Sequence, residues 1–189
     1  MLEEKSVFDL EEQNTHLVSR MVVALERISE AFRVLLWQEG MREKLSPIQI
    51  QLLIFIATHS TGHCTVSCLA REFNLTKATI SDAVKALEKK ELIGKMPSST
   101  DSRSYYIRLT PQAGPLVERL QMFANAFKGP IAHLDTQQQS DLWQSLLTLL
   151  RSLQQSGIIS QQRMCFSCAY YRQENGGHFC GLLKIPHKK

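Results

Sequence analysis

The sequence predicts a mainly α-helical fold with a small β wing, in which a winged helix-turn-helix lies between N-terminal and C-terminal dimerisation helices. Two observations carry this prediction. Near the middle of the chain a short polar turn links two amphipathic helical patterns, and an alternating pattern of strands follows them. The chain has 189 residues, of which 43% are hydrophobic, and this suffices for one substantial domain and an appendage.

The second helical pattern predicts a helix from Lys77 to Lys90 with Thr76 as its N-cap. Its residues Ile80, Val84 and Leu87 recur at one-turn spacing and predict a single buried stripe. The opposite face is short, polar and basic, and so suits the DNA major groove, where small donors and acceptors reach base edges and ammonium groups meet phosphate. The predicted DNA-binding residues of this helix are Thr76, Lys77, Ala78, Thr79, Ser81, Asp82 and Lys85. Taken alone, the same pattern also describes an ordinary amphipathic surface helix.

The neighbouring segments favour the DNA-binding interpretation. A short helix is predicted from Thr65 to Phe73, and Asn74 with Leu75 forms the tight connection of a helix-turn-helix. Beyond the second helix, two antiparallel strands are predicted at residues 92–96 and 105–109, joined by a polar, turn-rich loop. Such a hairpin is a wing. Arg103, near its tip, is predicted to contact the minor groove or a phosphate.

At this point the sequence resembles the MarR family of bacterial transcriptional regulators. The resemblance is carried by LSPIQIQLLIFIA, LAREFNLTKATISDAVKALEKKELI and the wing sequence STDSRSYYIRLT, and it extends over roughly Val18 to Leu150. It implies a homodimeric repressor on a pseudo-palindromic operator, with a small-molecule effector pocket between the winged domain and the dimer helices. The chain departs from the family pattern at Glu91 and Ala113, where glycine is usual.

Long apolar helices flank the predicted winged domain. Helical spacing runs from Leu17 to Trp37 and again from Asp141 to Leu153. A segment from Leu116 to Phe127 also carries an apolar stripe, which would need a partner surface if it extended away from the domain. We therefore predict dimerisation helices at residues 1–44 and 117–157 around a DNA-binding domain at 45–116. The alternative is a monomeric bundle that packs these faces internally.

Composition agrees with a cytoplasmic regulator. No apolar run approaches the roughly 20 residues that span a bilayer, and the acidic first residues differ from a secretory signal. The net charge is +4, and residues 158–189 hold five basic residues against one acidic residue, so the remainder is neutral overall. A modest net charge does not by itself indicate a nucleic-acid partner, and here its distribution is more useful.

The C-terminal tail, residues 158–189, is a predicted metal-binding segment. Cys165 and Cys168 form a C-x2-C pair, Cys180 follows a glycine turn, and His178 and His187 stand on either side of Cys180. Thiolates at this spacing can close on one ion, and in a protein of the cytoplasm they indicate a metal site more often than a disulfide framework. The predicted cofactor is zinc held by the three cysteines and one histidine. An iron-sulfur cluster on the same ligands is the alternative, and a pair of reduced thiols or a redox couple is the simpler interpretation.

A second pair of cysteines, Cys64 and Cys68, lies inside the predicted winged domain and is a candidate redox pair, although such cysteines are more often small packed side chains. An enzyme is not expected, because the sequence lacks a glycine-rich phosphate loop, a nucleophile elbow and a helix with paired metal-binding histidines. Two alternative functions stay open at this stage. One is a metal-dependent redox enzyme centred on the tail, and the other is a winged-helix module that binds protein or RNA.

Overall fold

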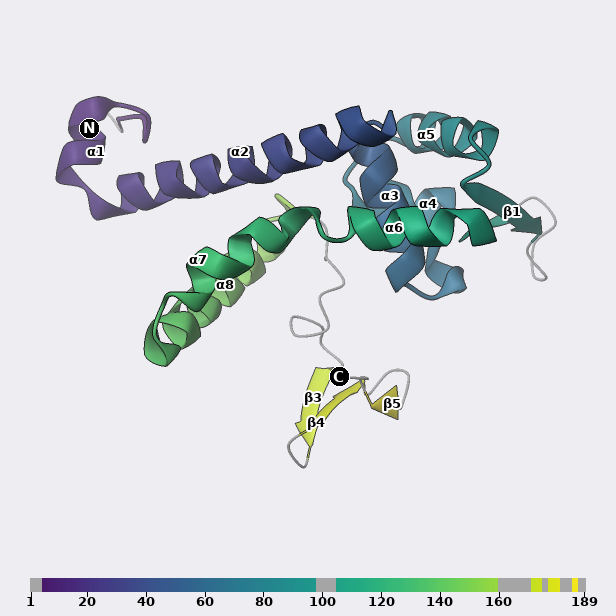
Figure 1. Ribbon diagram of the computed structural model, residues 1–189. Helices are drawn as coiled ribbons and strands as arrows, with labels where there is room; N and C mark the ends of the chain where they lie inside the picture. Colours follow the sequence, from purple (N-terminus) through teal and green to yellow (C-terminus); the bar gives the residue numbers. More distant parts are fainter. Residues whose placement is uncertain (1–4, 98–104, 160–170, 175–176, 181–184, 187–189) are drawn as a thin grey trace.

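A computed structural model of the chain, shown in Figure 1, describes residues 5–97, 105–159, 171–174, 177–180 and 185–186. The α-helices are α1 (Leu10–Thr15), α2 (Leu17–Glu43), α3 (Pro47–Thr58), α4 (Val66–Glu72), α5 (Lys77–Lys89), α6 (Gly114–Leu120), α7 (Lys128–Ala132) and α8 (Thr136–Gln155). Short 3-10 helices are η1 (Thr61–His63), η2 (Pro111–Ala113) and η3 (Phe123–Phe127). The strands are β1 (Ile93–Pro97), β2 (Tyr105–Leu109), β3 (Tyr171–Glu174), β4 (Gly177–Cys180) and β5 (Ile185–Pro186). The predicted mainly helical fold with a small antiparallel wing is confirmed.

The central helix of the winged domain is α3. A capping box starts it, because the Ser46 hydroxyl accepts a hydrogen bond from the Gln49 backbone amide and the Gln49 side chain accepts one from the Ser46 amide. Pro47 occupies the first turn, where its missing amide proton costs nothing. The helix is apolar on nearly all sides, and Ile50, Leu52 and Leu53 are fully buried. It therefore serves as the core element against which α2, α5, α6 and β2 pack.

The segment after the wing does not extend away from the winged domain. Helix α6 ends at Leu120, and its Val117 and Leu120 lie in the core of that domain. The following η3 then packs on α2, where the Phe127 ring stacks on Phe32 with centroids 4.1 Å apart. The apolar stripe of this segment is thus covered within the chain, and the winged-domain core extends past residue 116.

Two long helices form arms that project from the winged domain in Figure 1. Helix α2 has 27 residues, a length of about 40 Å, and helix α8 has 20 residues. A capping box between Asp135 and Gln138 starts α8, whereas His16 precedes α2 without a side-chain cap. Both helices are longer than their apolar patterns predicted. Among the described residues, these helices lack the apolar length that crossing a membrane requires.

The two departures from the glycine pattern have different outcomes. Glu91 adopts the left-handed conformation with φ of +59°, which is the conformation that glycine favours after a helix. Its carbonyl oxygen accepts hydrogen bonds from the Thr110 hydroxyl at 2.7 Å and from the Gln112 side-chain amide at 2.6 Å. Ala113, in contrast, is a buried right-handed residue in η2, so no glycine is required there.

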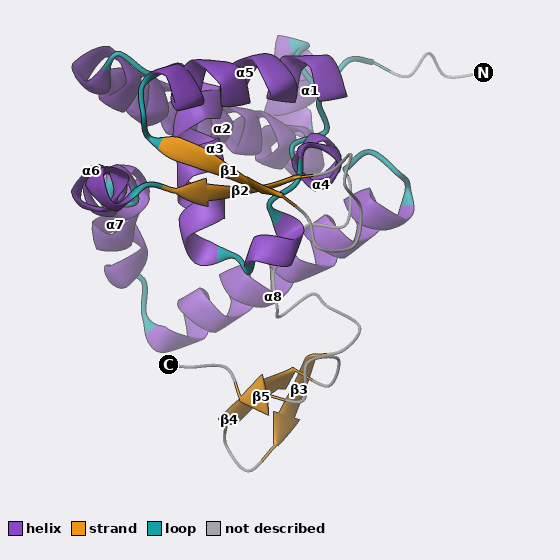
Figure 2. Cartoon of the chain, turned by 90° about the vertical axis from the view of Figure 1, so that its right-hand side faces the viewer, coloured by secondary structure: helices purple, strands orange, loops and turns teal. Residues whose placement is uncertain are grey.

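The tail contains a small three-stranded antiparallel sheet, drawn below the helices in Figure 2. Strand β3 pairs with β4, and Tyr171 lies opposite Cys180 in this register. Strand β4 also pairs with β5, which places Ile185 opposite Cys180 on the other side. The backbone of Cys180 therefore occupies the central strand of this sheet.

We expect Glu91→Gly to raise the free energy of unfolding by about 0.5 to 1 kcal/mol, because it removes the steric cost of a left-handed non-glycine residue at the end of α5. Chemical denaturation monitored by circular dichroism measures this change. The matched control is Lys89→Gly, two residues earlier. Lys89 is the last right-handed helical residue of α5, so this substitution should lower the free energy of unfolding by about 1 kcal/mol. A destabilised Glu91→Gly variant would contradict the argument.

Candidate nucleic-acid interface

The start of α5 is fixed by a hydroxyl cap. The Thr76 hydroxyl accepts a hydrogen bond from the Thr79 backbone amide at 3.1 Å and lies 2.9 Å from the Thr79 hydroxyl. On the inner side of the helix Ile80, Val84 and Leu87 are fully buried, as the predicted stripe requires. Because one side of α5 is held in the core, its opposite side must face outward.

The outer side of α5 carries the predicted DNA-binding residues. Thr76, Lys77, Ala78, Thr79, Asp82 and Lys85 are exposed, and Ser81 is half-buried. The Lys85 ammonium group lies 3.4 Å from the Asp82 carboxylate, one turn away on the same surface. Exposed ion pairs of this kind are weak, so Lys85 is available to a phosphate group. This surface combines short polar side chains with two ammonium groups.

The turn between α4 and α5 sets the angle between the two helices. Thr65 caps α4 by accepting a hydrogen bond from the Cys68 amide at 3.2 Å. Asn74 then turns the chain with φ of +52°, a conformation that asparagine tolerates well, and the Leu75 amide donates back to the Ala70 carbonyl at 2.9 Å. Figure 2 shows α4 and α5 crossing on the side of the domain beside the hairpin. The predicted helix-turn-helix geometry is therefore present.

The wing hairpin has an inner and an outer face. Strands β1 and β2 pair antiparallel, with Lys95 opposite Ile107 and Gly94 opposite Arg108. Ile93 and Ile107 are buried on the inner face, so alternation places Arg108 on the outer face, where it is exposed. Sequence reasoning missed Arg108, because its face is decided by the register of the pairing. Arg103, the predicted wing contact, lies outside the described residues.

Lys95 makes an ion pair with α5. Its ammonium nitrogen lies 2.6 Å from a carboxylate oxygen of Glu88, and this hydrogen bond raises the pKa of Lys95 above its ordinary value. Because the pKa of Lys95 is higher in the folded protein than in the unfolded chain, the pair stabilises the fold fully at any pH below the unfolded-state pKa. This stabilisation is lost only as the pH rises through the folded-state pKa. The pair is therefore intact at neutral pH.

The cysteines of the winged domain differ in their surroundings. Cys64 is buried, its thiol lies 3.6 Å from the Ser60 carbonyl, and its own carbonyl accepts a hydrogen bond from the Ile107 amide at 2.8 Å. Cys68 is half-buried on α4, with the Arg71 guanidinium 3.8 Å from its sulfur. Burial of Cys64 agrees with a packing role. A redox function of this pair stays a prediction.

Most of the predicted metal ligands lie outside the residues that the structure describes. Cys165, Cys168 and His187 lie outside the described residues, and Cys180 and His178 are described only through the backbone of β4. In the part of the chain whose side chains are described, no three potential metal-ligating residues gather at one point. A metal site in the tail therefore stays a prediction from the cysteine spacing.

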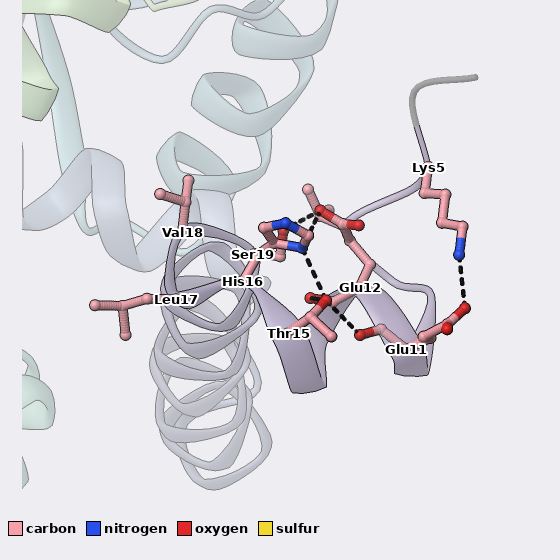
Figure 3. A pocket seen from close by; sticks show the side chains of 9 residues that line it. Lys5, Glu11, Glu12, Thr15, His16, Leu17, Val18 and Ser19 are labelled. Atoms are coloured by element: carbon pink, nitrogen blue, oxygen red, sulfur yellow. Dashed lines mark hydrogen bonds and ion pairs between the residues drawn. The ribbon is translucent and has the colours of Figure 1, made fainter. Parts of the chain in front are cut away.

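Two hollows lie near the arms. One, of about 760 Å³, opens at the elbow between α1 and α2, where Glu12 accepts a hydrogen bond from Ser19 at 3.2 Å and lies 3.2 Å from His16 (Figure 3). The other, of about 640 Å³, is bounded by α3, the α4–α5 turn and Ile159 beyond α8. The second adjoins the winged domain and the segment that follows α8.

The comparison with protein families agrees with this geometry. Residues 45–105 match the model of the MarR family. These residues run from the start of α3 to the first residue of β2, so the match includes the capped recognition helix α5 and the turn before it. The similarity to the MarR family therefore covers the helix-turn-helix and strand β1 of this chain.

Solved structures share the fold over most of their own length. A crystal structure of a complex of S. aureus MepR with DNA is 22% identical, covers 70% of this chain and 97% of its own, and has a TM-score of 0.61. Streptococcus pneumoniae FabT in complex with DNA is 19% identical, covers 74% of this chain and 99% of its own, and has a TM-score of 0.62. At these identities the likeness establishes the winged-helix fold and its flanking helices.

Proposed function

We propose that this protein is a MarR-like DNA-binding transcriptional regulator that acts as a homodimeric repressor on a pseudo-palindromic operator. The observation that carries the proposal is the outer face of α5, which presents Lys77, Ser81 and Lys85 beside the wing while its inner face is fully buried. Base edges would be read by the short side chains of α5, and phosphates would be bound by the lysines. Arg103 and Arg108 would extend the contact along the wing.

The apolar surface of the arms supports the homodimer. Six of the exposed apolar residues of α2 share one face, at helical spacing: Val18, Met21, Val22, Leu25, Ile28 and Phe32. On α8 the exposed apolar residues are Leu142, Trp143, Leu149 and Leu153. A contiguous apolar surface of this extent needs a cover in water. A two-fold symmetric pair of chains covers it and also presents two α5 helices to operator half-sites one helical turn apart.

We further propose that the tail binds one metal ion per chain. The β3–β4 register places Cys180 opposite Tyr171, which follows Cys168 by only three residues. The hairpin therefore returns the backbone of Cys180 to the first residue of β3. Zinc held by Cys165, Cys168, Cys180 and either His187 or His178 fits these donors, and an iron-sulfur cluster is the alternative. The metal would stabilise the tail or make the regulator respond to oxidants.

The first test identifies the DNA. Selection from a randomised duplex library should recover a pseudo-palindrome that the protein prefers by about a thousandfold or more over scrambled DNA. Lys85→Ala should make the fall of log affinity with log salt concentration less steep, by about 0.9 in the slope, because one phosphate contact is lost. Arg103→Ala should act in the same way, whereas Arg151→Ala on α8 removes an equal charge without this effect. Binding without sequence preference would instead favour a module for protein or RNA.

The second test concerns the dimer. Replacement of Val18 and Leu25 by glutamate should give a monomer at micromolar concentration, because two charges would be buried in the interface. Sedimentation velocity measures the mass of the parent and the variant. Arg27→Glu, on the opposite side of α2, is the control and should leave the dimer intact. A dimer that persists with both glutamates would exclude this face from the interface.

The third test concerns the metal. Protein purified without air should contain one zinc ion per chain, or iron with a visible colour, by elemental analysis and absorption spectroscopy. The double variant Cys165→Ser with Cys168→Ser should lose this metal, because two thiolate ligands are removed. Cys64→Ser with Cys68→Ser is the matched control and should retain it. Equal metal content in both double variants would end the proposal, and turnover of a redox substrate would favour the enzyme alternative.

A further inference from the structure

Lys95 lies on the inner face of the wing hairpin. It is two residues beyond the buried Ile93 and directly opposite the fully buried Ile107 in the strand register. Because side chains alternate along a strand, all three lie on the face that packs toward the domain. In the same register Arg108 lies on the outer face. The basic side chain of Lys95 is thus placed toward α5.

Two partners hold the Lys95 ammonium group. Glu88, in the last turn of α5, has a carboxylate oxygen 2.6 Å from the Lys95 nitrogen. The same nitrogen lies 5.0 Å from the centroid of the Tyr105 ring, on the paired strand. The side chains of Lys95 and Glu88 are 33% and 40% exposed, so the pair is partly shielded from water. One ammonium group therefore connects the recognition helix with both strands of the wing.

The two strands of the hairpin are attached to the domain in different ways. A two-stranded ribbon is only marginally stable by itself in water, so its orientation depends on contacts with the domain. Strand β2 packs on α3 and buries Ile107 fully, and the Ile107 amide donates a hydrogen bond to the Cys64 carbonyl. Strand β1 is attached at its buried end by Ile93 and, two residues nearer the tip, by Lys95.

We propose that Lys95 is a positioning residue, which holds the wing against the recognition helix through Glu88 and Tyr105 and does not itself bind a DNA phosphate. This inference rests on the proposed DNA-binding function. When the brace is absent, a smaller fraction of the protein has the wing in the orientation that binds. The apparent dissociation constant rises as this fraction falls.

Removal of the Glu88 carboxylate distinguishes a phosphate-binding role of Lys95 from a positioning role, because the two roles predict opposite changes in DNA affinity. Glu88→Met makes the protein more positive by one charge and liberates the Lys95 ammonium group. If Lys95 were a phosphate ligand, DNA binding would become tighter. If Lys95 is a brace, binding becomes weaker in spite of the favourable charge. Loss of the helix does not explain weaker binding, because a carboxylate in the last turn of a helix opposes the helix dipole.

The experiment measures affinity for a duplex selected by the parent protein from a randomised library and for a scrambled duplex of equal length, at several salt concentrations. Glu88→Met should weaken binding to the selected duplex about threefold to fivefold, with an unchanged salt slope. Glu118→Met, which removes a negative charge from the exposed surface of α6, is the matched control and should not weaken binding. Melting temperatures confirm that each variant is folded.

Three further variants complete the test. Adding Lys95→Met to Glu88→Met should cause little further loss, because both substitutions break the same contact. The exchange of Glu88→Lys with Lys95→Glu should restore affinity to within about twofold of the parent, since the pair is re-formed with opposite polarity. Lys95→Arg, which keeps the charge and the donor, should retain binding.

The outcomes are distinguishable. Binding of Glu88→Met that equals or exceeds that of the parent would overturn the positioning role. So would a fall of about 0.9 in the salt slope when Lys95→Met is added to Glu88→Met, because that fall marks a lost phosphate contact. A parent protein without preference for any duplex would refute the proposed function itself, and the inference with it.

Discussion

Burial of α3 is the constraint on which the rest of the winged domain depends. Leu52 faces a different side of this helix from Ile50 and Leu53, and all three are fully buried. A helix that is apolar on nearly every side must be surrounded. Helices α2, α5 and α6 and strand β2 each contact it. The position of the recognition helix and the wing is therefore set by how they cover α3.

The candidate DNA surface follows from this packing. Helix α5 buries Ile80, Val84 and Leu87, and so has no freedom to turn its polar side inward. The Thr76 cap decides where the helix starts. Strand β2 is joined to the loop before α4 through Cys64, and β1 is joined to α5 through Lys95 and Glu88. Recognition helix and wing thus belong to one packed unit with a single outward face.

The arms have the opposite property. Helix α2 contacts the domain through residues such as Leu36 and Gly40 near its C-terminal end, while Val18 and Met21 at the other end are exposed. Added bulk at Gly40 would meet the Leu45 carbonyl oxygen at 2.5 Å, which shows how closely the base of the arm approaches the start of α3. A rigid base and an apolar far end suit an arm that pairs with a second chain.

Local signals in the sequence were sufficient for most elements. The Thr76 cap and the buried stripe of α5 were predicted, because capping and helical periodicity depend on residues within a few turns of one another. Both strands of the wing were predicted within one residue. The polar outer face of α5 followed from the same periodicity. The predicted DNA-binding residues of this helix therefore came from the sequence alone.

Tertiary structure decided what depends on contacts between distant residues. Apolar spacing from residue 116 to 127 did not reveal that Val117 enters the core and that Phe127 stacks on Phe32. A glutamate at position 91 is left-handed because Thr110 and Gln112 bind its carbonyl from beyond the wing. Likewise, Lys95 and Arg108 are both basic residues of the hairpin, but only the strand register and the approach of Glu88 separate a brace from an outward charge. Composition and periodicity describe one segment at a time, whereas these outcomes arise from which segments meet.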